Sequence, residues 1–186
     1  MSALIKPECT QVLVIDMQEK LLPAMDAPEA VLANCVRLVQ AAARLSLPIT
    51  ISQQYPKGIG ATVAELRRHL PNDCMTLDKM AFSCIRDVAL RGRVEQLASD
   101  GREHVVVCGI EAHVCVLQTA IEIVEEGLQC FVVADAIASR APASKDIALT
   151  RMQASGVVAV TTEMAIFEWL GVAGTPDFKA LMPLVK

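Results

Sequence analysis

The sequence predicts an α/β protein: a three-layer α-β-α sandwich built around a doubly wound, six-stranded parallel sheet. Short apolar runs of strand length alternate along the whole chain with segments whose apolar residues recur at helical spacing. The runs are continuously apolar, which is typical of strands that helices cover on both faces. No linker, repeat or low-complexity segment interrupts this alternation, so residues 1–186 are expected to form a single domain.

Six apolar segments are the expected strands, and they lie at 12–17, 49–51, 75–77, 104–109, 130–134 and 157–161. Right-handed crossovers between parallel strands favour the strand order 3-2-1-4-5-6. In that order the winding direction reverses between the first and fourth strands. Ligands bind in such sheets beside this switch point, at the carboxyl ends of the strands.

Cap residues and helical periodicity predict the helices between the strands. Asp26-Ala-Pro-Glu29 and Thr62-Val-Ala-Glu65 both have the spacing of a capping box, which opens a helix. Further helices are expected over 87–98, 114–126, 145–155 and 162–169. Thr162 is the expected cap of the helix over 162–169. A last short helix is expected to begin at Thr175-Pro176.

The composition excludes several classes of protein. Hydrophobic residues make up 53% of the chain and aromatic residues only 3%, so the core must be aliphatic. The net charge is −4 and the basic residues are scattered, which argues against a nucleic-acid or polybasic membrane surface. No apolar run approaches the ~20 residues that span a bilayer, and the N-terminus does not resemble a secretory signal. We therefore expect a soluble cytoplasmic protein with no nucleic-acid or membrane partner.

The seven cysteines do not form a recognisable disulfide or metal framework. Their number is odd, no CxxC pair is present, and they lie at 9, 35, 74, 84, 108, 115 and 130. In a cytosolic protein of this hydrophobicity, most are expected to be reduced and to serve as small buried side chains.

Three chemically useful side chains fall where this fold places its ligands. Asp16 ends the first strand, Lys79 follows the third, and Cys115 lies just past the fourth strand in the first turn of a helix. Each has a structural explanation when taken alone: Asp16 as a cap, Lys79 as a solvated side chain, and Cys115 as part of the core. Because all three are expected at the same edge of the sheet, a shared functional site is favoured over three separate structural roles.

A thiol at this position has the chemistry of a nucleophile. A helix N-terminus and a nearby lysine would both be expected to lower the pKa of Cys115. A base must still take its proton and return it later. His104 begins a strand at the opposite sheet edge, His69 lies in an outer helix, and His113 would not share a helix face with the cysteine. Asp16 is therefore the better candidate base.

Several segments resemble the isochorismatase-like cysteine hydrolases, and the resemblance runs along nearly the whole chain. The first three blocks resemble motifs of the family, and the last two resemble its isochorismatase-domain-containing branch. In order, they are Val14-Ile-Asp-Met-Gln18, Asp78-Lys-Met-Ala-Phe-Ser83 and Gly109-Ile-Glu-Ala-His-Val-Cys-Val116, then Ser52-Gln-Gln-Tyr-Pro-Lys-Gly58 and 161–170.

The resemblance implies an Asp-Lys-Cys catalytic triad formed by Asp16, Lys79 and Cys115. It also implies a cis peptide bond before Glu111, and an oxyanion hole formed by the backbone N–H groups of Glu111 and Cys115. The family often has threonine three residues before the cysteine, where this chain has Ala112. One supporting hydroxyl is therefore absent.

No metal or other cofactor is expected. Nicotinamidases of the family carry an Asp/His metal cluster after the second strand, whereas Gln53-Gln54-Tyr55 in this chain contains neither residue type. Tyr55 and Phe82 are candidates for lining the pocket.

The leading functional hypothesis is hydrolysis of a small amide or carbamoyl-like C–N bond through a covalent thioester. One alternative is an isochorismatase-type hydrolase of a vinyl ether. Another is a non-catalytic oligomeric binding protein that keeps the fold. The expected partners are a small-molecule substrate and further copies of the same chain.

Overall fold

The computed structural model describes residues 4–185 and contains one parallel sheet with the strand order β3-β2-β1-β4-β5-β6. The predicted fold class and strand order are confirmed. The strands are β1 (Thr10–Ile15), β2 (Ile49–Gln54), β3 (Met75–Lys79), β4 (His104–Ile110), β5 (Gln129–Ala138) and β6 (Val158–Val160).

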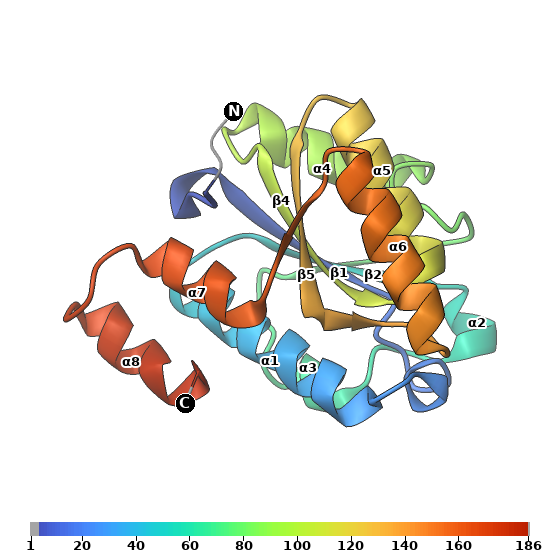
Figure 1. Ribbon diagram of the computed structural model, residues 1–186, viewed down its shortest axis with the longest axis horizontal. Coiled ribbons are helices and arrows are strands. Elements are labelled where there is room, and N and C mark those ends of the chain that lie inside the picture. Colours follow the sequence, from blue (N-terminus) through green and yellow to red (C-terminus); the bar gives the residue numbers. More distant parts are fainter. Residues whose placement is uncertain (1–3, 186) are drawn as a thin grey trace.

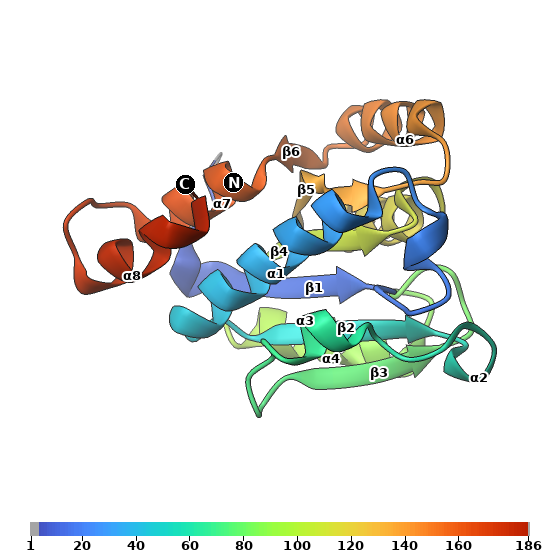
Figure 2. The ribbon, with the colours of Figure 1, turned by 90° about the horizontal axis from the view of Figure 1, so that it is seen from below.

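Helices cover both faces of the sheet (Figure 1). On one face lie α1 (Pro28–Arg44), α3 (Ala64–Arg67), α7 (Thr162–Leu170) and α8 (Pro176–Val185), and on the other lie α4 (Val88–Ser99), α5 (Leu117–Glu125) and α6 (Pro142–Ala154). Figure 2 shows β1, β2 and β3 pointing toward the short helix α2 (Pro56–Ile59), while α8 lies at the opposite end. The carboxyl ends of the strands are thus remote from the C-terminal helix. None of the helices described is both long and apolar enough to cross a membrane.

The two-faced core explains why the strands are continuously apolar. In β1, Val12 and Val14 pack in the cluster under α1, while Leu13 and Ile15 pack in the cluster under α4 and α5. Successive strand side chains point to opposite faces, so a strand covered on both sides needs an apolar residue at every position.

Two of the predicted helix caps are wrong. Helix α1 has Ala27, not Asp26, as its N-cap residue, because Pro28 occupies the first turn and fixes the start one residue later. Before α3, the hydroxyl of Thr62 donates to Gln53 Oε1 at 2.9 Å, and Val63 becomes the N-cap residue. Because the Thr62 hydroxyl bonds Gln53, it is not available to cap the helix as the capping box would require.

A similar competition moves the start of α7. Its N-cap is Thr161, whose hydroxyl accepts the N–H of Met164, rather than the predicted Thr162. The hydroxyl of Thr162 instead donates to Asp135 Oδ1 at 3.0 Å.

Gly109 allows β4 to approach β1 closely at the carboxyl edge. It pairs with Ile15 in the sheet register and has a φ of 115°, which favours glycine. A Cβ atom at this position would lie 2.0 Å from the backbone oxygen of Ile15. Because that contact is with backbone, the strands would have to move apart one residue before Asp16.

We predict that Gly109→Ala lowers the free energy of unfolding by about 2–6 kcal/mol, through backbone strain and steric overlap together. Gly127→Ala is the matched control, since Gly127 has a φ of 85° but no atom within 4 Å of an added Cβ. It should show the strain alone, about 1–3 kcal/mol. Denaturant unfolding measures both, and equal losses would contradict the steric argument.

Candidate active site

Asp16 directly follows β1 and adopts a backbone conformation that is unusual for its residue type. Its φ is 51°, in the left-handed region, and its side chain is fully buried. Its backbone N–H donates to the carbonyl oxygen of Ser52 at 3.2 Å, which continues the pairing of β1 with β2 by one residue. Such strained conformations persist only where surrounding contacts hold them, and they are frequent at functional sites.

Asp16 forms a fully buried ion pair with Lys79, the last residue of β3. Lys79 Nζ lies 2.7 Å from Asp16 Oδ2 and 2.7 Å from Gln54 Oε1. The same ammonium group donates to the carbonyl oxygens of Phe82 at 3.0 Å and Ala81 at 3.3 Å. Burial opposes the positive charge most strongly, but the Asp16 carboxylate and the nearby Cys115 and Cys84 together outweigh it and raise the pKa of Lys79. The lysine is therefore a cation with every donor engaged.

The second oxygen of Asp16 is also occupied. Ser52 Oγ donates to Asp16 Oδ1 at 2.7 Å, and both side chains are buried. The carboxylate is thus bound from β2 on one oxygen and from β3 on the other.

Gln54 and Gln18 connect this ion pair to the neighbouring loops. Gln54 Nε2 donates to the carbonyl oxygen of Met80 at 2.9 Å, so its amide holds both Lys79 and the loop after β3. The side chain of Gln18 bonds both the N–H and the carbonyl of Gln54, at 2.8 and 2.9 Å, and also reaches the carbonyl of Gly60 at 2.6 Å. These hydrogen bonds fix the chain segments that leave β1, β2 and β3.

Cys115 lies in a π-helical turn (Ala112–Val116) that leads directly into α5, and it is 5% exposed. Burial and the Asp16 carboxylate, which is within hydrogen-bond reach of the thiol, together raise the pKa of Cys115, whereas Lys79 lowers it. The expectation of a lowered pKa is therefore wrong. The lysine acts in the predicted direction, but burial and the neighbouring carboxylate outweigh it. The resting side chain is a thiol next to a carboxylate.

A second thiol borders the same group of residues. Cys84 is fully buried, and its N–H donates to Thr119 Oγ1 at 2.9 Å. Burial and the charge of Asp16 raise its pKa to about 11. Cys84 is therefore also protonated at neutral pH.

The segment between β4 and Cys115 has an unusual backbone. The Ile110–Glu111 peptide bond is cis, as the family resemblance implies. The carbonyl oxygen of Glu111 accepts the N–H groups of Val114 and Val116, and its side chain forms an ion pair with Arg140 at 2.9 Å. Ala112 is completely buried, so a methyl group packs where relatives often place a hydroxyl.

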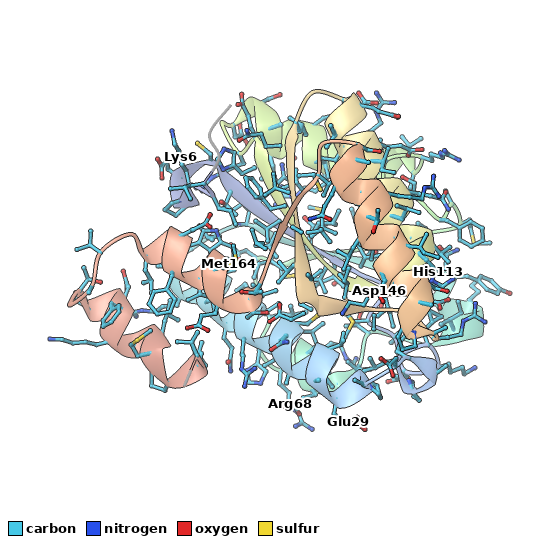
Figure 3. The ribbon with its side chains drawn as sticks, in the orientation of Figure 1. Lys6, Glu29, Arg68, His113, Asp146 and Met164 are labelled. Atoms are coloured by element: carbon cyan, nitrogen blue, oxygen red, sulfur yellow. The ribbon has the colours of Figure 1, made fainter. Side chains whose placement is uncertain are left out.

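The three histidines are engaged elsewhere. His104 begins β4 at the amino edge of the sheet and accepts the N–H of Lys6 at 3.1 Å, and burial lowers its pKa. His69 follows α3 and bonds Gln40. His113 lies near α6 (Figure 3) and bonds the hydroxyl of Ser139 at 2.9 Å. Asp16 is thus the ionisable group that acts on the Cys115 thiol most directly.

A cavity of about 310 Å³ opens at the ends of β2 and β3. It is lined by Tyr55, Pro56, Lys57, Asp78, Lys79, Met80 and Asp87. Tyr55 thus lines a cavity, whereas Phe82 does not line this one and contributes its carbonyl to Lys79. The cavity lies on the β3 side of the switch point and does not include Cys115. The loop after β3 folds over the lysine, whose ammonium group donates to the carbonyl oxygens of Ala81 and Phe82.

Sequence reasoning did not identify Ser52, Gln54, Gln18 or Cys84 as parts of the site. The usable signal was in β2, where Thr50, Ser52 and Gln54 alternate with residues of the α1 cluster and are all buried. Polar side chains on a buried strand face need partners, and two of these three find theirs in Asp16 and Lys79.

Comparison with known proteins agrees with this architecture. The isochorismatase domain model matches residues 10–164, and the chain belongs to the isochorismatase family. Mouse isochorismatase domain-containing protein 2A is 33% identical over 98% of this chain and 85% of its own. The secreted isochorismatase effector Isc1 of Phytophthora sojae is 33% identical over 97% and 86%. Among solved structures, MAR1 ribonuclease from Caenorhabditis elegans has 33% identity and a TM-score of 0.91, covering 98% of this chain and 92% of that one.

We predict that Asp16→Asn accelerates alkylation of Cys115 by iodoacetamide at about pH 8 while it abolishes turnover. The Asp16 charge raises the thiol pKa, so its removal lowers that pKa by about 1–3 units and increases the thiolate fraction tenfold per unit. Mass spectrometry of Cys115 gives the alkylation rate. Asp78→Asn, which alters a carboxylate bonded to Gln53 instead, should leave the rate unchanged. Slower alkylation in Asp16→Asn would contradict the assignment.

Proposed function

We propose that this protein hydrolyses the C–N bond of a small, neutral amide or carbamoyl-like substrate, with Cys115 as nucleophile and Asp16 as general base and acid. The observation that carries the proposal is a protonated thiol beside a buried carboxylate whose charge is balanced by Lys79. A thiol in this state cannot attack until a base accepts its proton, and Asp16 is the base in reach.

The reaction follows from these roles. Asp16 takes the proton from Cys115 Sγ as the sulfur attacks the carbonyl carbon. The C–N bond then breaks, and the proton held by Asp16 passes to the departing amine, leaving a thioester on the sulfur. Water, deprotonated by Asp16, attacks the thioester, and the thiol recovers its proton as the acid leaves. In this proposal the backbone N–H groups of Glu111 and Cys115 stabilise the oxyanion of each tetrahedral intermediate.

Lys79 has an electrostatic role in this scheme rather than a proton-transfer role. Its ammonium donors are committed to Asp16, Gln54 and two carbonyls of its own loop. The lysine forms an ion pair with Asp16, and its charge acts to lower the pKa of the thiol. It therefore reduces the free energy needed to form a thiolate in a buried setting.

The charges around the cavity favour a neutral substrate. Lys79 is balanced by Asp16, and the acidic Asp78 and Asp87 accompany the basic Lys57 in the cavity wall. A dicarboxylate would require a surplus of cations there, so the geometry favours an amide over the vinyl ether of an isochorismatase. The half-exposed ring of Tyr55 and the 70% exposed side chain of Met80 suit an apolar substituent.

The ribonuclease named among the solved relatives marks a second candidate function, which the surface of this chain disfavours. A ribonuclease must attract a polyanion, and such proteins carry clustered lysine and arginine. This chain has a net charge of −4, and Arg140, at the Glu111 segment, is paired with that acid. A non-catalytic binding protein is the third candidate, and amide hydrolysis that depends on Cys115 distinguishes an enzyme from it.

Self-association and a cytoplasmic location also stay predictions. Seven free cysteines suit a reducing compartment, although the Phytophthora relative is named as secreted. Exposed apolar side chains such as Val88, Ile147 and Val172 suit contacts with further copies of the chain.

We predict that Cys115→Ala folds normally and loses hydrolysis of acetamide, benzamide and 4-nitroacetanilide, a panel of neutral amides. Residual activity should be below about a thousandth of wild type, which corresponds to roughly 4 kcal/mol of transition-state stabilisation. Cys130→Ala, which removes a fully buried thiol from β5, should stay active and serves as the control. Higher residual activity in Cys115→Ala would remove the cysteine from the nucleophile role.

We predict that chelation with EDTA leaves amide hydrolysis unchanged, because the chemistry assigned to Asp16 and Cys115 needs no metal ion. The expectation rests on the end of β2, where Gln53-Gln54-Tyr55 contains neither the Asp nor the His that the family resemblance implies for a nicotinamidase metal cluster. Metal analysis of the purified protein accompanies the assay. Stoichiometric zinc or iron, with activity lost on chelation and restored by the ion, would overturn the metal-free mechanism.

A further inference from the structure

Ser52 holds Asp16 at two points. Its carbonyl oxygen accepts the Asp16 backbone N–H at 3.2 Å, and its hydroxyl donates to Asp16 Oδ1 at 2.7 Å. The first bond secures a residue whose φ of 51° is otherwise unfavourable, and the second secures its side chain. An ionised carboxylate can only accept, so the serine hydroxyl must be the donor.

The two carboxylate oxygens are bound by two different side chains. Ser52 holds Oδ1 and Lys79 holds Oδ2, each at 2.7 Å. Rotation of the carboxylate about its terminal torsion would break both hydrogen bonds, and each is strengthened because one partner is charged. The plane of the carboxylate is therefore fixed relative to Cys115. Lys79 alone would leave Oδ1 unsatisfied in a site without exposed surface.

The two buried hydroxyl groups on this face of β2 differ in their hydrogen bonding. Ser52 is completely buried on the β2 face whose other buried polar residues are Thr50 and Gln54. Thr50 Oγ1 has no hydrogen-bond partner, whereas the Ser52 hydroxyl bonds the carboxylate that acts on Cys115. Burying a hydroxyl without a partner is unfavourable, and the carboxylate offsets that penalty for Ser52.

We propose that Ser52 is a positioning residue for the reaction, which holds the Asp16 carboxylate in the one orientation that serves Cys115. The inference rests on the proposed hydrolase function and adds a residue to it. Ser52 is completely buried and its hydroxyl donates to Asp16 Oδ1, so it acts through Asp16 and not on the substrate. Its effect should therefore fall on the chemical step.

The test compares three variants of β2 in the hydrolysis of acetamide, benzamide and 4-nitroacetanilide. Ser52→Ala should lower kcat about ten- to hundredfold, the effect of losing one hydrogen bond to a charged group, with KM unchanged. Ser52→Thr restores the hydroxyl and should recover most of the lost kcat. Thr50→Val removes the unpartnered hydroxyl of the same strand face and should keep wild-type kcat.

The outcomes separate the inference from the function on which it rests. Wild-type kcat in Ser52→Ala, with Cys115→Ala inactive, would overturn the positioning role and leave the hydrolase standing. Equal losses in Ser52→Ala and Thr50→Val, or a loss confined to KM, would also overturn it. Thermal unfolding identifies a variant that fails to fold, and if Ser52→Thr does so, the kcat and KM of Ser52→Ala decide. No amide hydrolysis by the wild type, or full activity in Cys115→Ala, would overturn both proposals.

Discussion

The buried ion pair between Asp16 and Lys79 is the constraint on which the rest of the site depends. Taking two charges out of water costs several kcal/mol per ion, and their attraction offsets this only when further hydrogen bonds satisfy both groups. The strand between them, β2, supplies those bonds through Ser52 and Gln54. The loop after β3 supplies two carbonyl oxygens. Ser52 and Gln54 of β2 thus satisfy the charged groups that the neighbouring strands β1 and β3 place beside them.

The ion pair also influences the protonation state of Cys115. Many reactive cysteines are thiolates at rest, stabilised by a cation without a competing anion. Here Asp16 pairs with the lysine and also acts on the thiol, and its charge together with burial keeps the proton on Cys115. Such a site stores a neutral thiol that resists oxidation and alkylation. In the proposed mechanism it becomes nucleophilic only when a substrate carbonyl allows the proton to move to Asp16.

The fold and the positions of the three central residues could be predicted because both depend on local pattern. Continuous apolar runs specify a covered parallel sheet, and residues that end its strands must meet at one edge, as Asp16 and Lys79 do. The partners of these residues could not be predicted. The expected second strand covers only 49–51, so Ser52 and Gln54 fall outside it, and the register of β2 is what places them beside Asp16 and Lys79. The direction of the Cys115 pKa depends on burial, and the caps at Thr62 and Thr162 were lost to partners distant in sequence.

The carbonyl oxygens of Ala81 and Phe82 bind the lysine with backbone atoms, which every amino acid possesses. The ammonium therefore places no demand on the side chains at those two positions, and Phe82 projects outward with more than half of its surface exposed. Evolution can alter the side chains at these two positions, and with them the shape and polarity of the loop surface, without disturbing the charges beneath. One set of buried groups can in this way accompany many different loop surfaces.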